Sequence, residues 1–361
     1  MRDFYELAEK AVGVTAFSDF HAHLFQEFSK VDAEYGSDRF RTQCNALETV
    51  LDVADGKNHI VVFLGDLFHK RGAVDTLVMN HILRIFAKYS DVPILMIRGN
   101  HDSKTNSLYS ESSLEAFKFM KNIKVVDTPE LVSTRHAEFL CIPYGDEVDY
   151  MKEVLADGIS KLTKPGFILA HVGVDGASTG KESHRLEGAF GTADFQADNP
   201  NVTAVLLGHY HKRQFLGGHN NMLYCGNTVQ TSFSDEGQEK GMYHVNGFTK
   251  GSEIEFQAID APMFLTIDGN NVPDNIEELL EKHYVRFIGT SSQIKAVQTA
   301  IESTGTTNIR VMEKKDYDTE ARIAITPKST PEEVTKAYAR QYFPKAEGVA
   351  LECLKEALNN N

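Results

Sequence analysis

The chain has 361 residues, 42% of them hydrophobic and 24% charged, which is ordinary for a globular protein with one large domain and smaller modules. Its formal net charge of -14 argues against binding nucleic acid through a broad basic surface alone, because phosphate neutralisation requires clustered Lys and Arg. Metal ions in an acidic cleft, or a basic partner, would remove that objection.

The amino-terminal residues mix charged with apolar side chains, and no run approaches about 18 uninterrupted apolar residues. We therefore expect neither a signal peptide nor a membrane-spanning helix. The four cysteines lie far apart without paired spacing, which predicts neither a disulfide framework nor a thiolate zinc site. Both features favour a soluble cytoplasmic protein.

Between residue 11 and about residue 260, short apolar runs alternate first with helix-period segments and then with further strands, which is an α/β pattern. The predicted buried strands are 12–17, 59–64, 93–97, 138–142, 166–170 and 202–207. Helical spacing of apolar residues covers 39–54, 73–89, 113–120 and 148–162. Three more strands without long helices between them, at 222–225, 241–245 and 254–258, predict a second, hairpin-rich sheet. We assign residues 1–260 to one domain.

A smaller unit begins near Asp260-Ala261-Pro262, where the rhythm of the sequence changes. Its predicted strands are 263–267, 284–288, 308–312 and 321–325, and its predicted helices are 274–283 and 293–303. We assign residues 261–328 to a small α/β domain. Thr330-Pro331-Glu332-Glu333 then predicts a helix start with a capping box, followed by a second amphipathic stretch after Pro344. Residues 329–361 are therefore expected to form carboxyl-terminal helices.

Five predicted strands are each followed at the carboxyl end by residue types that ligate metals, and this end of an open α/β sheet is where ligands bind. The segments are Asp19-Phe20-His21, Gly65-Asp66, Gly99-Asn100-His101-Asp102, His171 and Gly208-His209-Tyr210-His211. We expect Gly65, Gly99 and Gly208 to let the backbone turn sharply, so that the next side chain points into a shared cleft.

Carboxylate, imidazole and amide oxygen together suit manganese, iron or zinc, whereas a magnesium site would contain fewer imidazoles. The set is too large for one ion. Divided between two ions about 3.5 to 4 Å apart, it needs one shared carboxylate, for which Asp66 is the natural candidate. Two such ions activate a shared water and offset charge on a phosphorane, so the pattern predicts phosphoester hydrolysis.

Any one of these histidines, taken alone, is more often an ordinary core or surface residue. Their joint occurrence and order carry the prediction. The variant Asp19-Phe20-His21-Ala22-His23 also contains the His-x-His that opens the metal site of amidohydrolase barrels. Such a barrel would need eight βα units and a late catalytic aspartate, which this chain does not offer, so His23 is expected behind the ligands or facing solvent.

The five motifs, in this order from residue 19 to residue 211, resemble the calcineurin-like metallophosphoesterase superfamily. Gly65-Asp66-Leu67-Phe68-His69 resembles its SbcD branch, the nuclease subunits of double-strand-break processing complexes, including archaeal, eukaryotic and T-even phage relatives. Tyr224-Cys225-Gly226-Asn227-Thr228, with Gln230 and Lys240-Gly241, is similar to that branch's segment after the last histidine motif. The resemblance implies a two-sheet sandwich flanked by helices, a small capping domain and carboxyl-terminal helices.

The resemblance also implies a role for each motif residue. One ion would be held by Asp19, His21, Asp66 and His211, and the other by Asp66, Asn100, His171 and His209. His101 would lie beside the scissile phosphate, stabilising charge or protonating the leaving oxygen, and His69 would help orient the substrate. Asp102 would either orient His101 or serve as a loop or helix-capping aspartate.

The function implied is a manganese-dependent DNA exonuclease and endonuclease, although magnesium, iron or zinc remain alternatives for the metal. It would act as a homodimer with an SbcC-type ATPase in DNA repair and recombination. The carboxyl-terminal helices would dock the coiled coil of the ATPase or simply pack on the small domain. A stand-alone phosphoesterase for nucleotides or phosphoproteins is the alternative. A non-catalytic scaffold is disfavoured, because all seven ligands are present.

Overall fold

The computed structural model describes residues 2–178, 189–305, 308–314 and 329–359. It contains two compact units, Met1–Met312 and Glu313–Asn361. Within the described residues, no helix is both long and apolar enough to cross a membrane.

Two six-stranded sheets form most of the first unit. The first sheet has the order β12-β11-β1-β2-β3-β4, with bounds Glu253–Ala258, Gly241–Asn246, Gly13–Phe17, His59–Phe63, Ile94–Ile97 and Ile123–Val126. The second has the order β5-β6-β7-β8-β10-β9, with bounds Glu130–Ser133, Glu138–Ile142, Gly166–His171, Val202–Gly208, Met222–Tyr224 and Gln214–Phe215. Strands β1 to β4 run parallel to one another, as do β6, β7, β8 and β10.

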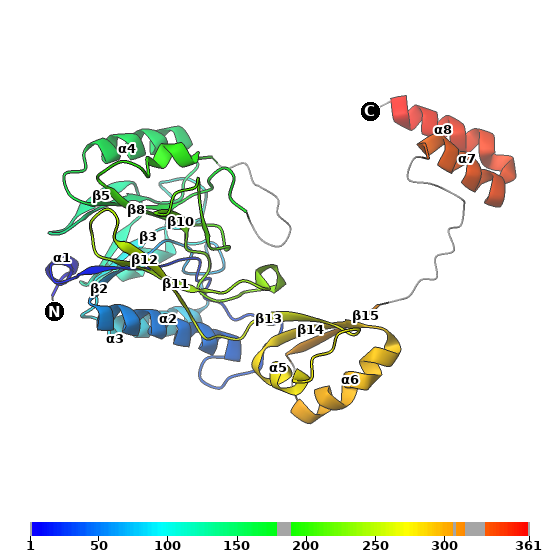
Figure 1. Ribbon diagram of the computed structural model, residues 1–361, viewed down its shortest axis with the longest axis horizontal. Helices are drawn as coiled ribbons and strands as arrows, with labels where there is room; N and C mark the ends of the chain where they lie inside the picture. The colour runs from blue at the N-terminus through cyan, green and yellow to red at the C-terminus, as the bar shows by residue number, and fades with distance from the viewer. Residues whose placement is uncertain (1, 179–188, 306–307, 315–328, 360–361) are drawn as a thin grey trace. The chain divides into compact units, whose positions relative to one another are not determined.

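Alternating side chains of the central strands point to opposite faces of each sheet. In β2, Ile60 and Val62 enter the core between the two sheets, while Val61 and Phe63 enter the core beneath the helices. Helices α2 (Asp38–Lys57) and α3 (Thr76–Lys88) cover the outer face of the first sheet, and α4 (Val148–Ser160) covers that of the second. Figure 1 shows them on opposite sides of the sheets. The predicted two-sheet sandwich flanked by helices is confirmed.

The third sheet, β13-β14-β15, lies at the end of the first unit, with bounds Phe264–Asp268, Tyr284–Gly289 and Ile309–Glu313. Helices α5 (Ile276–Lys282) and α6 (Ser291–Thr304) pack on it (Figure 1). The strand predicted at 321–325 lies outside the described residues. In the second unit, α7 (Pro331–Tyr342) begins at the predicted Thr330 capping box and packs against α8 (Glu347–Asn359).

Several short elements differ from the prediction. Helix α1 (Phe4–Ala8) and strands β4, β5 and β9 were not predicted, because segments of two to five residues carry little periodicity. The segment predicted as a helix at 113–120 is a 3₁₀ helix, Ser113–Phe119. Its buried residues Leu114 and Phe117 are three apart, a spacing that places both on one face of a 3₁₀ helix.

Candidate metal centre

Side chains from the carboxyl ends of β1, β2, β3, β7 and β8 meet where the two large sheets come together. Four of them belong to non-glycine residues with positive φ: Asp19 at 48°, His21 at 50°, Asp66 at 64° and His209 at 105°. Such conformations are uncommon and cost of order 1–3 kcal/mol each. The fold therefore holds strained backbone at the point where the predicted ligands converge.

The first group of donor atoms comes from the ends of β1, β2 and β8. His21 Nε2 lies 3.0 Å from His211 Nε2 and 3.8 Å from Asp66 Oδ2. A carboxylate oxygen of Asp19 lies within 4.8 Å of a ring nitrogen of both histidines. This arrangement brings two imidazoles and two carboxylates to one place.

The second group surrounds the side-chain oxygen of Asn100. Its Oδ1 lies 3.0 Å from His171 Nε2 and 3.1 Å from His209 Nδ1. His171 Nε2 is also 3.5 Å from Asp66 Oδ2, so the Asp66 carboxylate lies between the two groups. The other nitrogen of His171, Nδ1, donates to the carbonyl of Leu64 at 2.6 Å, which orients Nε2 toward the cluster as in many metal-binding histidines.

Burial and mutual charge set the protonation of this cluster. Burial, together with the neighbouring His171, lowers the pKa of His209 to about 4, so His209 is neutral at pH 7. Burial also acts to lower the pKa of His171, but the Asp66 carboxylate outweighs it and raises that pKa to about 9. Burial raises the pKa of Asp19. For Asp66, burial acts to raise the pKa, but His171 and His21 hold it below its usual range.

The described residues fit divalent cations. Asp19 and His171 are fully buried, and ionised carboxylates buried among imidazoles are costly unless a cation offsets their charge. Carboxylate, amide and imidazole donors also match the preferences of borderline transition metals. The cluster offers these donors in two groups that share Asp66, so the side chains could hold two ions.

Of the three glycines predicted to turn the backbone, only Gly65 has the expected positive φ, at 97°. Gly99 and Gly208 serve a different purpose, because their lack of a Cβ provides space. A Cβ at Gly99 would lie 2.2 Å from Asp66 Oδ1, and one at Gly208 would lie 2.2 Å from the Ser18 hydroxyl. The prediction that glycine is needed for a sharp backbone turn is therefore wrong at Gly99 and Gly208.

Asp102 fixes the two turns that carry Asp66 and Asn100. Its buried carboxylate accepts hydrogen bonds from the backbone N–H groups of Asp66 at 2.8 Å, Leu67 at 2.9 Å and Gly99 at 3.0 Å. Burial raises its pKa to about 6. Of the two predicted alternatives, the loop aspartate is the one found, since the ring of His101 bonds elsewhere.

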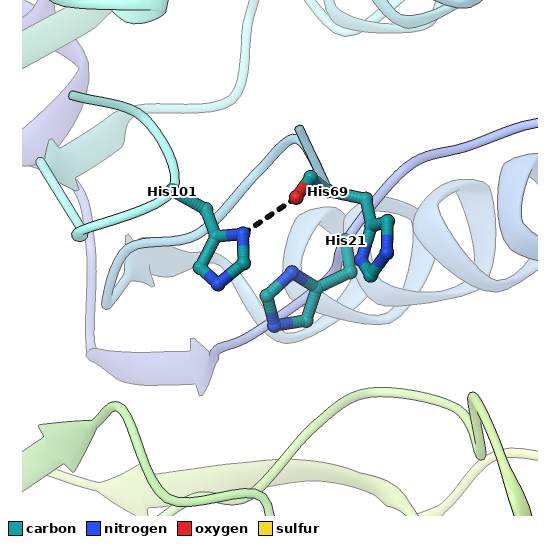
Figure 2. A group of neighbouring side chains, drawn as sticks. All are labelled: His21, His69 and His101. Carbon is teal, nitrogen blue, oxygen red and sulfur yellow. Dashed lines mark hydrogen bonds between the residues drawn. The ribbon is translucent and has the colours of Figure 1, made fainter. Parts of the chain in front are cut away.

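Figure 2 shows the imidazoles of His21, His69 and His101 side by side. The ring centroids of His21 and His101 are 4.7 Å apart, and those of His21 and His69 are 5.5 Å apart. His101 Nδ1 donates to the backbone carbonyl of His69 at 2.5 Å, so its Nε2 remains available to a ligand. His23 packs against His69, with ring centroids 5.0 Å apart.

Gln43 of α2 is a supporting residue that the sequence did not reveal. Its side-chain amide donates to the carbonyls of Phe20 and His21 at 3.0 and 2.9 Å, and its Oε1 accepts from the N–H of His23 at 3.1 Å. These bonds hold the strained turn after β1. A single glutamine inside an amphipathic helix produces no pattern from which this role could be inferred.

Comparison with known proteins supplies the family. Residues 13–213, more than half of the chain, match the family described as calcineurin-like phosphoesterase. The chain belongs to this family. This phosphoesterase is similar to an SbcCD nuclease subunit of Staphylococcus saprophyticus, with 24% identity over 253 residues, covering 63% of this chain and 66% of that protein.

It is also similar to the DNA double-strand break repair protein Mre11 of Methanosarcina acetivorans, with 28% identity over 323 residues, covering 81% of this chain and 48% of that protein. The chain thus spans less than two thirds of the length of both relatives. Among solved structures, a dimetal phosphatase from Danio rerio has 10% identity and a TM-score of 0.41, covering 66% of this chain and 94% of the other.

Proposed function

We propose that this phosphoesterase hydrolyses phosphodiester bonds in DNA, using two divalent ions for which manganese is the preferred metal. The observation that carries the proposal is the convergence of seven ligand-type side chains, in two groups that share Asp66. In the proposed assignment, Asp19, His21 and His211 hold one ion, Asn100, His171 and His209 hold the other, and Asp66 bridges them.

When bound, two divalent ions supply an activated water nucleophile and positive charge for the phosphate oxygens. The chain's own contribution begins with His101. Because Nδ1 of His101 donates to the His69 carbonyl, Nε2 is the atom that meets the substrate. When protonated there, His101 stabilises the phosphate or gives its proton to the leaving oxygen. His69, beside it, orients the phosphate.

DNA is favoured over small phosphoesters by the Gly65-to-His69 motif and by the two relatives described as a nuclease subunit and a DNA break repair protein. The net charge of -14 means that a partner would supply much of the basic surface. We therefore include an SbcC-type ATPase partner, a homodimer and a role in DNA repair and recombination in the proposal.

The second unit supports the ATPase part of the proposal. Helices α7 and α8 form an apolar groove lined by Val334, Tyr338, Phe343, Ala346 and Ala350. Phe343 is 59% exposed, and such a groove suits an amphipathic helix. Phe343→Glu should weaken co-purification with the coiled coil of an SbcC-type ATPase, with hydrolysis of a small phosphodiester unchanged. Unaltered co-purification would place the dock elsewhere.

The nuclease activity is tested by degradation of end-labelled duplex DNA with manganese. The wild-type chain should cut the DNA, a chelator should stop it, and Asp66→Asn should lower the rate on the order of 10³-fold, because the bridging charge is lost at nearly constant volume. Asp198→Asn, which alters an exposed carboxylate, is the matched control. Hydrolysis of bis-p-nitrophenyl phosphate without DNA cutting, in the presence of the ATPase, would favour a stand-alone phosphoesterase instead.

The role of His101 is separated from that of the ligands by His101→Ala. This variant should bind manganese as the wild type does but lose rate by about 10² to 10⁴-fold, the usual contribution of a general acid. Manganese binding is measured by titration calorimetry on the same preparation. A variant that no longer binds two ions would show that His101 is itself a ligand.

A further inference from the structure

The loop between β10 and β11, residues 226–240, contains polar side chains that the proposed hydrolysis does not use. We call it the tie loop. Five of its polar residues are buried, namely Asn227, Thr228, Gln230, Asp235 and Lys240. The same segment carries the sequence resemblance described above, which gave it no role. Buried polar residues need partners, and here the partners lie in two different places.

At one end, the tie loop contacts the backbone of a proposed ligand. The side chain of Lys240 is 5% exposed, and its Nζ donates to the carbonyl of His211 at 2.7 Å and to Gln238 Oε1 at 2.8 Å. Asp235 Oδ1 lies 3.1 Å from the same ammonium and neutralises it. A buried ammonium bonded to one carbonyl fixes the position of that peptide.

Asp235 is in turn held by the tie loop itself. Its Oδ2 accepts from Thr231 N at 2.9 Å and from the side chain of Asn227 at 3.0 Å. The backbone N–H of Asn227 donates to the His211 carbonyl at 3.2 Å. The carbonyl of His211 therefore receives two hydrogen bonds from a single network.

Thr228 extends this network to the first strand. Its hydroxyl donates to the carbonyl of Ser18 at 3.0 Å, and the hydroxyl of Ser18 donates to Asp19 Oδ2 at 2.6 Å. Asp19 and His211 are assigned to the same ion, so the tie loop supports two ligands of that ion from behind.

At its other end, the tie loop covers the free edge of the third sheet. Among the described residues, β13 pairs with β14 alone, and its N–H groups on the other side have no strand partner there. The N–H of Phe264 donates to Gln230 Oε1 at 2.6 Å, and the N–H of Thr266 donates to Glu236 Oε1 at 2.6 Å. Two side chains of the tie loop thus replace the missing neighbour strand.

We propose that Lys240 is a positioning residue that acts through His211, and that the tie loop couples the docking of β13 to the ion held by Asp19 and His211. This inference rests on the ligand assignment of the proposed function. In this arrangement, the third sheet influences metal binding without contributing a ligand.

The test is a manganese titration of the full chain by calorimetry, with electron paramagnetic resonance to distinguish paired from single ions. Lys240→Met keeps the length of the side chain and removes the ammonium. The variant should bind one of the two manganese ions with about 10 to 100-fold lower affinity, which is the usual loss when a residue that supports a metal ligand is changed. The resonance signal of a pair of ions should then be replaced by that of a single ion. Lys240→Arg, which retains a donor for the His211 carbonyl, should restore the paired signal.

Two further variants separate positioning from folding. Lys240→Met alone leaves the Asp235 carboxylate buried without its partner, whereas the double variant Lys240→Met with Asp235→Asn buries no charge there. The double variant should therefore regain stability but keep the lowered manganese affinity. Glu239→Gln alters an exposed residue of the same loop that pairs with Arg213, and should bind both ions normally. Recovery of wild-type manganese affinity in the double variant would overturn the positioning role.

The coupling to the third sheet is tested by Glu236→Ala, which removes the acceptor for Thr266. This variant should lower the affinity for the same manganese ion as Lys240→Met does, but by a smaller factor. Unchanged affinity in Glu236→Ala would overturn the coupling, and unchanged affinity in Lys240→Met would overturn the whole inference. A wild-type chain that does not bind two ions would instead overturn the proposed function together with the inference.

Discussion

At the scale of single residues, the candidate centre depends on groups that are not among the proposed ligands. Asp102 is the clearest case, because its carboxylate bonds to the turns that carry Asp66 and Asn100. Gln43 does the same for the turn after β1. These residues offset the strain of the positive φ angles at Asp19, His21 and Asp66, which would otherwise relax.

Asp102→Asn should therefore destabilise the metal-free chain. Its amide would place N–H groups where Oδ2 accepts from Asp66 and Gly99, leaving two buried donors unpaired at a cost of about 3 kcal/mol. Urea unfolding in a chelator measures the loss, and Asp198→Asn is the exposed control. A stability equal to that of the control would contradict the anchoring role.

The sequence allowed the proposed ligands to be predicted because each one directly follows an apolar strand. The supporting residues could not be predicted in this way. Asp102 was noticed only through its place in Gly99-Asn100-His101-Asp102, and its backbone partners depend on a turn from another strand. Gln43 and Lys240 lie 22 and 29 residues from the ligands whose carbonyls they bond, distances over which local pattern gives no information.

At the scale of elements, three neighbouring strands share a buried polar chain. Thr15 of β1 bonds His59 Nδ1 of β2 at 3.1 Å and His244 Nδ1 of β11 at 3.0 Å. Nε2 of His244 donates to Gln257 Oε1, so its Nδ1 accepts from the Thr15 hydroxyl, which in turn accepts from His59. This chain of hydrogen bonds requires a neutral His244, because a protonated Nδ1 could not accept from the Thr15 hydroxyl.

This arrangement predicts a loss of stability in acid. Burial, and then His244, lowers the pKa of His59 from its ordinary value of about 6.5 to about 4. The unfolded chain therefore binds a proton first, and the stability that this residue contributes above pH 6.5 is lost as the pH falls toward 4. In a chelator, the urea midpoint of His59→Gln should fall less over this range than that of the wild type. If the urea midpoints of the two proteins changed in parallel with pH, His59 would not be the residue responsible for the loss of stability.

The strands easiest to predict are those whose residues are apolar on both faces, such as β7 and β8, because burial on both sides produces a continuous apolar run. The strands that were missed, β4, β5 and β9, are short and lie at the ends of their sheets. The pairing of β10 beside β8 could not be inferred, since strand order depends on packing between distant segments.

At the scale of the whole molecule, the charge distribution limits how the chain alone can hold DNA. The basic residues beside the candidate centre are few, and some are already paired. Lys104 lies 3.7 Å from Glu111, and Arg213 lies 2.9 Å from Glu239. With a net charge of -14 around them, these residues can neutralise only a small number of phosphates.

Binding of duplex DNA by the non-cutting Asp66→Asn variant should therefore depend only weakly on salt. A plot of log affinity against log salt at fixed manganese should have a slope of about -3 or shallower, because each neutralised phosphate contributes about -0.9. Fluorescence anisotropy of labelled DNA measures it. A slope near -8 would mean that an extensive basic surface exists, and the need for a partner would disappear.

The division predicted at residues 260 and 328 stays a prediction. The structure groups the three-stranded sheet with the first unit, whose last residue is Met312. The contacts of the tie loop with β13 give a physical reason, since they join that sheet to the sandwich.

The most direct test of the central claim is the position of bound manganese. A crystal of the wild-type chain grown with manganese, measured by anomalous diffraction, should show two peaks about 3.5 to 4 Å apart, with the Asp66 carboxylate between them. We expect Asp19, His21 and His211 around one peak and Asn100, His171 and His209 around the other. A single peak, or peaks away from these side chains, would contradict it.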